Sequence, residues 1–448
     1  MVSTTPAFNL KVVLKETGLA ADTLRAWERR YGLPVPQRTR GGHRLYSQRD
    51  IETIKWLMKR QTEGLSISRA VDMWNEQLAA GSDPLADLID SLLASASPVL
   101  SQNRTPDTTL DLLRSQWVEA CIEFNESKAE QTLNQAFSMF PVEVVCLDVL
   151  QRGLSEIGDL WQENQVSVQQ EHFASGLAMR RLDALLISTP PPTRNQILLI
   201  GCPPGEWHVF TPLLFALFLR RRGFPLIYLG GNVPAPRFAD TVKNVKADLV
   251  ILIAQQLVTA ATLQETVFLL AKQKISVAFG GRIFNVQPEI TNSISGYFLG
   301  TELIAALDEI ELILRSKATH RQQKTASQEY ITAHQSFTSK RTQIELTLKE
   351  TLEPNSISPE DVKTGIHFLG DNITAALQLG DMSYVSAEVD WLKNLLQAYE
   401  TPSQQLIHFM KTYARSLDQA MDGQGKPIFE WFAAEIQKLD NDGLVEDY

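Results

Sequence analysis

The segment from about residue 196 to 316 alternates short apolar runs with stretches of helix length, and this alternation restricts the fold more than any other feature. The runs are QILLIG, PLIYLGG, ADLVILIA, ISVAFGG and GYFLG. Apolar residues at consecutive positions, rather than at every second one, indicate strands that are buried on both faces, as in a parallel sheet covered by helices. We therefore expect a doubly wound α/β domain over residues 195–317.

Polar and small residues follow three of these predicted strands. Residues 206–208 (EWH) follow the first strand, and the Gly-Gly pairs 230–231 and 280–281 follow two others. Ligands of doubly wound domains bind outside the carboxyl ends of the strands, and glycine there allows a large flat ligand to approach the backbone closely. This edge of the sheet is therefore the predicted ligand site.

The charge of the chain is divided unevenly. Residues 1–60 hold 12 Lys and Arg against 5 Asp and Glu, a local charge of +7. Because the net charge of the whole chain is −10, the other 388 residues together carry −17. Such an asymmetry indicates one module built for a polyanion, joined to modules that are not.

The basic N-terminal part has the pattern of a winged helix-turn-helix domain, expected over residues 1–80. Apolar residues recur at helical spacing on both sides of Gly18, which predicts two short helices and a tight turn. Residues 33–47 combine two prolines, a Gly-Gly turn and several basic residues, which favours a basic hairpin wing. A helical stretch follows, with Ser47 as its predicted N-cap and Asp50 at the third helical position.

Four short motifs here, TLR (23–25), WERRYGL (27–33), GGHRLY (41–46) and DI (50–51), together with Pro36, strongly resemble the MerR family of transcription factors. The resemblance covers roughly residues 8–75. It implies a homo-oligomer on double-stranded promoter DNA, with the second helix in the major groove; a basic solvated surface is the alternative. The implied DNA contacts are Arg25, Arg29, Arg30, Arg40, His43, Arg44 and Tyr46.

A linker and a helical bundle are predicted between the winged helix-turn-helix domain and the α/β domain. Residues 81–107 are rich in Ser, Pro and Asp, as linkers are. Over residues 108–190, apolar side chains recur at intervals of three and four in successive segments, so a four-helix bundle is the simplest packing.

A bundle followed by a doubly wound domain with an acid-x-His motif resembles the cobalamin-binding modules of methionine synthase and its relatives. In the bundle, nine residues separate Trp161 from Glu171-His172, which is similar to the Trp-x9-Glu-His signature of light-sensing adenosylcobalamin regulators of the CarH and LitR type. The implied cofactor-binding residues are Trp161, Glu171, His172, Glu206, His208, Thr211, Gln255, Leu257, Gly280 and Gly281.

The resemblance also implies the role of each group. His208 would be the lower cobalt ligand, and Glu206 would fix its tautomer and raise its basicity. Trp161 would cover the upper face near the adenosyl group, Glu171 would hydrogen-bond that group, and His172 would help to close the cap. The alternatives are a degenerate domain in which His208 is an ordinary hydrogen-bonding residue, and a Trp161 that belongs to the bundle core.

Three positions depart from the family pattern. Thr211 replaces the glycine of the histidine motif, Gln255-Gln256-Leu257 replaces Ser-x-Leu after the third strand, and Gln162 follows the cap tryptophan. Thr211 is expected to crowd the cofactor tail, while Gln255 can still donate a hydrogen bond to it. Gln162 stands where some regulators have a histidine that ligates cobalt after illumination, so no such adduct is implied.

The remaining residues, 325–440, are predicted to form an all-α domain of five helices. Its aromatic-rich interior weakly resembles the globin-like domain of photocobilins, which holds an open-chain bilin such as biliverdin. No cysteine lies beyond Cys202, so a bilin here would be bound noncovalently, with His367 or His408 near its pyrrole nitrogens. A dimerisation or protein-docking domain has the same pattern.

We therefore predict a light-responsive regulator that senses adenosylcobalamin and is not an enzyme. A sensor domain that binds no cobalamin is the first alternative, and a cobalamin-dependent methyltransferase-like enzyme is the second. The fold class is multidomain α and α/β. The N-terminus lacks a secretory pattern, and the three cysteines have neither CxxC nor finger spacing, which favours the cytoplasm and no membrane partner.

Overall fold

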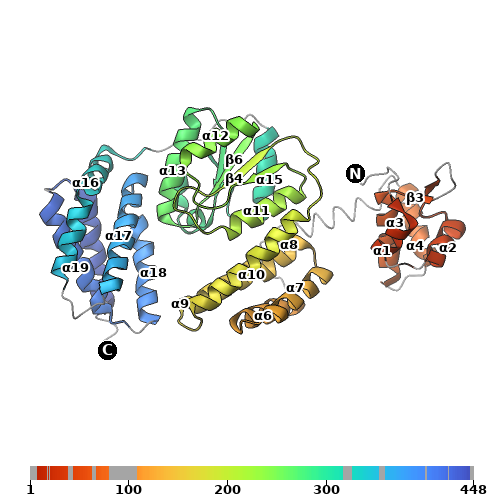
Figure 1. Cartoon of the computed structure of the whole chain (residues 1–448), viewed down its shortest axis with the longest axis horizontal. Coiled ribbons are helices and arrows are strands. Elements are labelled where there is room, and N and C mark those ends of the chain that lie inside the picture. Colours follow the sequence, from red (N-terminus) through yellow and green to blue (C-terminus); the bar gives the residue numbers. More distant parts are fainter. Residues whose placement is uncertain are drawn as a thin grey trace. The chain divides into compact units, whose positions relative to one another are not determined.

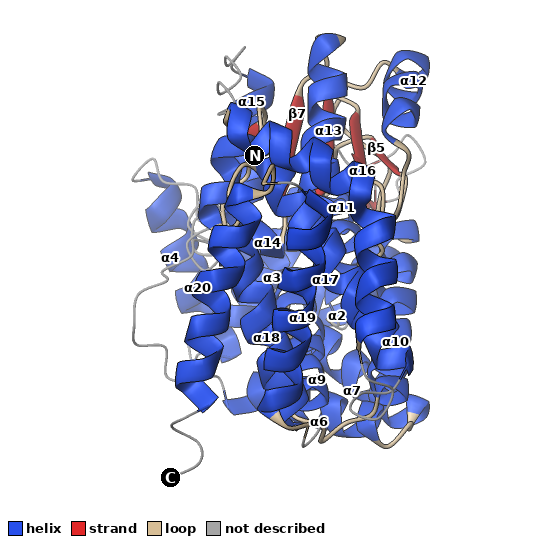
Figure 2. Ribbon diagram, turned by 90° about the vertical axis from the view of Figure 1, so that its left-hand side faces the viewer, coloured by secondary structure: helices blue, strands red, loops and turns tan. Residues whose placement is uncertain are grey.

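The computed structural model describes residues 8–17, 19, 21–38, 44–62, 67–79, 108–315, 325–352, 359–398, 401–421 and 423–443 (Figure 1). The contacts divide the chain into two compact units, Met1–Gln102 and Asn103–Tyr448. Helices predominate, and the strands of the larger sheet are confined to one region of the second unit (Figure 2). The expected combination of helical parts with a parallel α/β part is confirmed. In the described residues, no helix is both long and apolar enough to cross a bilayer.

The first unit contains four helices and a small antiparallel sheet in the described ranges. The helices are α1 (Leu10–Thr17), α2 (Ala21–Tyr31), α3 (Gln48–Thr62) and α4 (Ile67–Ala79), and the strands, in the order β1-β3-β2, are β1 (Phe8–Asn9), β3 (Arg44–Tyr46) and β2 (Gln37–Arg38). Ser47 and Asp50 cap α3 reciprocally: the Ser47 backbone N–H donates to Asp50 Oδ2 over 2.7 Å, and the Asp50 N–H donates to Ser47 Oγ over 3.2 Å.

The second unit begins with the helical bundle. Its elements are α6 (Thr108–Ile122), α7 (Glu126–Met139), α8 (Val142–Val145), the π-helical turn η1 (Cys146–Gln151), α9 (Arg152–Gln162) and α10 (Val168–Ile187). Because α8, η1 and α9 follow one another without a break, they form one long helix. With α6, α7 and α10, this helix makes up a bundle of four. Ser167 and Gln170 form a capping box that begins α10 and so fixes where Glu171 and His172 lie.

A five-stranded parallel sheet follows, in the order β5-β4-β6-β7-β8. The strands are β4 (Leu198–Gly201), β5 (Leu226–Tyr228), β6 (Leu249–Ile253), β7 (Val277–Gly280) and β8 (Tyr297–Phe298), and the helical segments between and after them are α11 (Phe210–Arg221), α12 (Ala235–Val245), α13 (Leu257–Lys272), α14 (Arg282–Val286), the 3-10 helix η2 (Pro288–Ser293) and α15 (Leu303–Arg315). The strand β5 lies on one side of β4, and β6 lies on the other. The chain therefore changes direction across the sheet after β5, and the switch point lies between β4 and β6. The loops after these two strands therefore meet at the switch point.

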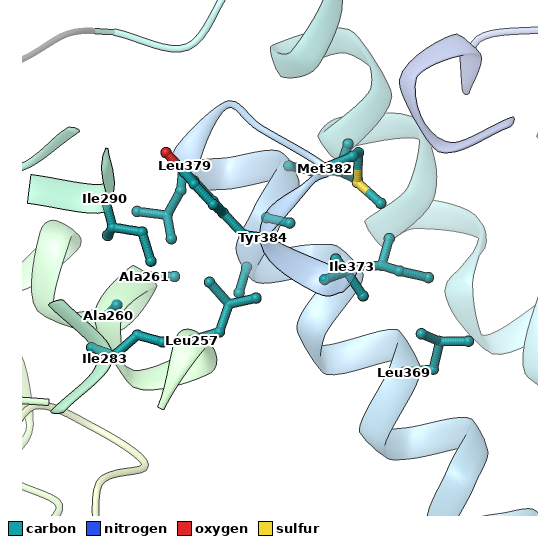
Figure 3. Close-up of a cluster of buried hydrophobic side chains, with 14 of the residues drawn as sticks. Leu257, Ala260, Ala261, Ile283, Ile290, Leu369, Ile373, Leu379, Met382 and Tyr384 are labelled. Atoms are coloured by element: carbon teal, nitrogen blue, oxygen red, sulfur yellow. The ribbon is translucent and has the colours of Figure 1, made fainter. Parts of the chain in front are cut away.

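Where the structure describes the C-terminal part, it consists of five helices: α16 (Gln328–Thr351), α17 (Pro359–Leu379), α18 (Tyr384–Ala398), α19 (Ser403–Met421) and α20 (Lys426–Gly443). They share one hydrophobic core with α13 and α14 of the α/β part, in which Leu257 and Ile283 face Tyr384 and its neighbours (Figure 3). Polar contacts reinforce this junction, since Gln378 Nε2 donates to the Ala261 carbonyl over 2.8 Å. The C-terminal helices are thus packed directly against α13.

Candidate cofactor site and nucleic-acid interface

A buried carboxylate and a half-exposed imidazole form a pair in the loop after β4. Glu206 is fully buried, whereas the His208 side chain is 60% exposed. His208 Nδ1 lies 2.7 Å from Glu206 Oε1, and the His208 backbone N–H donates to the same oxygen over 2.9 Å. This contact occupies Nδ1, so Nε2 is the nitrogen left to bind a metal.

The second oxygen of Glu206 is held from the far side of the switch point. Glu206 Oε2 accepts from the Gln255 backbone N–H over 2.7 Å and from Thr259 Oγ1 over 2.6 Å. Thr259 stands at the N-terminus of α13, so one carboxylate ties together the loop after β4, the loop after β6 and α13. Thr259 is not among the residues predicted from the sequence. Its spacing indicates the contact, because Thr259 is three residues after the helix-capping Gln256, a position from which a side chain can reach back to the preceding loop.

The two groups polarise each other. Burial raises the pKa of Glu206, but the hydrogen bonds from His208, Thr259 and the backbone outweigh it, so the pKa lies below its usual value. The hydrogen bond to Glu206 raises the pKa of His208, against the effect of burial and of Arg282. The negative charge of Glu171, on α10, raises the pKa of His208 further.

A cavity of about 140 Å³ opens beside this pair, between α11 and the carboxyl ends of β6, β7 and β8. Its lining includes Thr211, Gln255, Gly280, Gly281 and Arg282. Gln255 Oε1 accepts from the Arg282 backbone N–H over 2.9 Å, while Gln255 Nε2 is buried without a hydrogen-bond partner. A buried unpaired donor in the wall of a cavity fits a ligand that brings an acceptor.

Gly281 is a position at this edge where a side chain does not fit. Its φ of +124° is a conformation that side chains rarely allow, and a Cβ there would lie 2.0 Å from the Ala254 carbonyl oxygen. The backbones after β6 and β7 can therefore approach each other closely. Leu257 is placed differently from the prediction: it is fully buried in the core shared with α17 and does not line the cavity (Figure 3).

The other predicted cofactor residues lie on the bundle. Trp161 is half-buried in the last turn of α9, next to the half-buried Gln162. On α10, Glu171 Oε2 lies 2.6 Å from His172 Nδ1, and the His172 side chain is 74% exposed. Among the described residues, the charge of Glu171 acts on His208, whereas no hydrogen bond or ion pair joins Trp161 or His172 to the His208 loop.

On the first unit, α2 presents three exposed arginines, Arg25, Arg29 and Arg30. The antiparallel pairing of β2 with β3 forms the expected hairpin, in which Gln37 opposes Leu45. Cationic side chains on an exposed helix beside a hairpin can contact a phosphate backbone and base edges.

Two family models match the chain. The model described as "MerR HTH family regulatory protein" matches residues 8–77, and "B12 binding domain" matches residues 113–186. The chain combines a MerR helix-turn-helix domain with a B12-binding domain. The B12 match lies on the helices α6–α10, while the Glu206–His208 pair belongs to the α/β part that follows them.

Two curated relatives match about half of the chain. The HTH-type transcriptional repressor CarH of Myxococcus xanthus is 29% identical over 244 residues, which are 54% of this chain and 77% of CarH. The repressor CarA of the same organism is 26% identical over 245 residues, 54% of this chain and 75% of CarA. The chain is thus homologous to the CarH and CarA repressors. The structure of the Methanosarcina barkeri monomethylamine corrinoid protein is 15% identical, with a TM-score of 0.40 over 45% of this chain and 99% of that protein.

Within the MerR domain, the prediction that Tyr46 contacts DNA is corrected. Tyr46 is fully buried in the domain core, and its hydroxyl donates to Glu28 Oε1 over 2.5 Å. Burial and the Glu28 carboxylate raise the pKa of Tyr46, so the phenol stays neutral. Arg44 donates from Nε to Glu28 Oε2 over 2.8 Å. Arg40 and His43 lie outside the described residues.

Replacing Glu28 by alanine is expected to loosen the wing of the MerR domain. The change leaves the buried Tyr46 hydroxyl and the Arg44 guanidinium without their acceptor, which costs about 1–3 kcal/mol of unfolding free energy. Urea unfolding of the variant checks this value. Asp72→Ala, an exposed change on α4, is the control. Equal stability of the Glu28 and Asp72 variants would contradict the prediction.

The two histidines proposed for a bilin lie on the surface of the C-terminal part. The His367 side chain is 54% exposed, with its Nδ1 4.0 Å from Glu345 Oε2, and His408 is exposed on α19. In the described ranges, no hydrogen bond or ion pair joins His367 to His408. Bilin binding through them stays a prediction.

Proposed function

We propose that this protein is a MerR-type transcription regulator that binds adenosylcobalamin and changes its binding to promoter DNA in response to light, as a homo-oligomer without catalytic turnover. The observation that supports the cofactor most directly is the pair of Glu206 and His208. It lies at the switch point of the sheet, with Nδ1 occupied and with a cavity beside it whose wall holds the unpaired Nε2 of Gln255.

The described residues fit the cofactor in three places. His208 would hold cobalt from below, and the buried Glu206 would keep its ring oriented. Gln255 and Thr211 would contact the nucleotide tail in the cavity, where Gln255 Nε2 is a donor in need of an acceptor. Glu171, with Trp161 near the end of α9, would face the adenosyl group from the bundle.

When bound, adenosylcobalamin supplies a cobalt–carbon bond that light breaks. The protein contributes the response of α9 and α10, the bundle helices that would cover the adenosyl group. Trp161 and Glu171 would contact the adenosyl group, and without those contacts α9 and α10 would be free to repack. We infer that this repacking is what alters the binding of DNA by the MerR domain.

Absorption spectra of the full chain test the proposal. Purified protein is mixed with adenosylcobalamin in the dark, freed of unbound cofactor and measured before and after illumination; biliverdin is tested in a parallel sample. A bound cobalamin spectrum that changes on illumination is the expected result. An unchanged protein spectrum with both compounds would favour a regulator with a cobalamin-free sensor.

Gel shifts with promoter DNA test the other half of the proposal. Retardation should weaken steeply as the salt concentration rises, because phosphate contacts release counterions. Arg25→Ala combined with Arg29→Ala should abolish specific retardation, and Lys272→Ala, on the α/β part, should leave it unchanged. Specific binding that survives the double change would contradict the role of α2.

Cobalamin binding is expected to strengthen as the pH rises from about 6 to about 8. Metal ligation needs an unprotonated Nε2, and the raised pKa of His208 means that a proton competes for that nitrogen near neutral pH. Because the pKa of His208 is raised in the folded protein, the protonated imidazole is favoured at low pH, and it gives way to the neutral form as the pH rises through that pKa. Titrations at pH 6, 7 and 8 measure the effect, and affinity that falls with rising pH would contradict it.

A further inference from the structure

Glu388, on α18, is a half-buried carboxylate that the site described so far does not use. In the described part of the chain, its carboxylate makes no hydrogen bond or ion pair. Burial raises its pKa, and Arg282 is the neighbouring charge that acts in the opposite direction. An acid that is partly withdrawn from water without a hydrogen-bond donor destabilises the fold, and such groups are frequent in binding sites.

The position of α18 connects this carboxylate to the cofactor site. The helix contacts α9, the bundle helix that carries Trp161 in its last turn. At its start, the Tyr384 carbonyl accepts from Gln287 Nε2 over 3.0 Å, directly after α14 of the α/β part. One helix of the C-terminal part thus touches both parts between which the cofactor is proposed to bind.

Arg282 and Glu388 lie on two elements that meet, α14 and α18. Arg282 is the first residue of α14, directly after Gly281, and it lines the cavity beside Gln255. Glu388 follows Tyr384 by one helical turn and therefore lies on the same face of α18, where Tyr384 packs in one core with Ile283 of α14. The charge of Arg282 lowers the pKa of Glu388 against the effect of burial, in agreement with this placement.

We infer that α18 is a wall of the cofactor site, where Glu388 and Arg282 bind the amide side chains on the edge of the corrin ring. This inference rests on the proposed function. A primary amide has an NH₂ group that donates and a carbonyl that accepts, so a carboxylate beside a guanidinium matches both halves. The C-terminal part then takes part in cobalamin recognition directly, whatever else it binds.

The binding of adenosylcobalamin in the dark, by full-length protein, tests this assignment. We expect Glu388→Ala to weaken binding about tenfold, the loss of roughly one charge-assisted hydrogen bond. The spectrum of the bound cofactor should stay that of the wild type, since His208 is untouched. Glu388→Gln keeps an acceptor oxygen and should lose less. Asp390→Asn removes a carboxylate from the same helix that pairs with Lys438, and should bind like the wild type.

Thermal unfolding of the cofactor-free variants separates binding from folding. Glu388 has a raised pKa, so its ionised form is disfavoured in the folded state, and Glu388→Gln should unfold at the same temperature or higher. Wild-type affinity in Glu388→Ala, or an equal loss in Asp390→Asn, would overturn this inference alone. Failure of the wild type itself to bind adenosylcobalamin would overturn the proposed function with it.

Discussion

Replacing His208 by alanine is expected to abolish the spectrum of cobalamin ligated by a protein histidine and to weaken cofactor binding by a factor of about 100 or more. The change removes a metal ligand outright, whereas loss of a group that only orients a ligand typically costs 10–100-fold. Glu206→Gln should therefore have an effect in that smaller range, because the ring stays while its Nδ1 partner weakens.

The control for this prediction is another exposed histidine. His367→Ala changes a side chain that is 54% exposed on the C-terminal part, and it should leave the cobalamin spectrum intact. Absorption spectra and equilibrium dialysis of the three variants provide the measurement. A His208→Ala protein that retains the wild-type spectrum would show that another group binds the cobalt.

Gly281→Ala is expected to be the most disruptive single change at the carboxyl edge of the sheet. The new Cβ would lie 2.0 Å from the Ala254 oxygen and 2.8 Å from the Ala254 carbonyl carbon, so backbone atoms have to move. The positive φ adds a conformational cost of about 1–3 kcal/mol. We expect a loss of more than about 3 kcal/mol of stability, with loss of cobalamin binding, because the β6 and β7 loops separate.

Gly280→Ala is the matched control, one residue earlier. Its Cβ would lie 3.9 Å from Leu299 Cβ, an ordinary contact, so its stability should change little. Denaturant unfolding of both variants decides the matter. Similar stability for the two would mean that the backbone at Gly281 relaxes at low cost.

Local patterns were sufficient for the elements of this protein. Five consecutive apolar runs predicted the five strands, and the helical spacing predicted the bundle, the two helices before the wing and the five C-terminal helices. These patterns depend on the repeat of a helix or a strand, which is set by a few neighbouring residues. The Ser47–Asp50 cap is local in the same way and was found from the sequence.

The sequence predicted only part of the candidate site. The loop with Glu206 and His208 could be found because both residues lie in one short motif. Thr259, which holds the other oxygen of Glu206, lies 53 residues further along the chain. Tyr46 was assigned to DNA by the resemblance to the MerR family, and its burial depends on the packing of β3 against the helices.

The sequence by itself determined which segments become strands, which become helices, and which chemical groups stand at their ends, because those properties follow from local spacing and residue type. The tertiary structure alone decided which groups meet. The strand order brings the β4 and β6 loops together around one carboxylate, and the packing of α17 on α13 brings α18 beside α9. Contacts between residues far apart in the chain depend on how whole elements pack, and no local pattern encodes that.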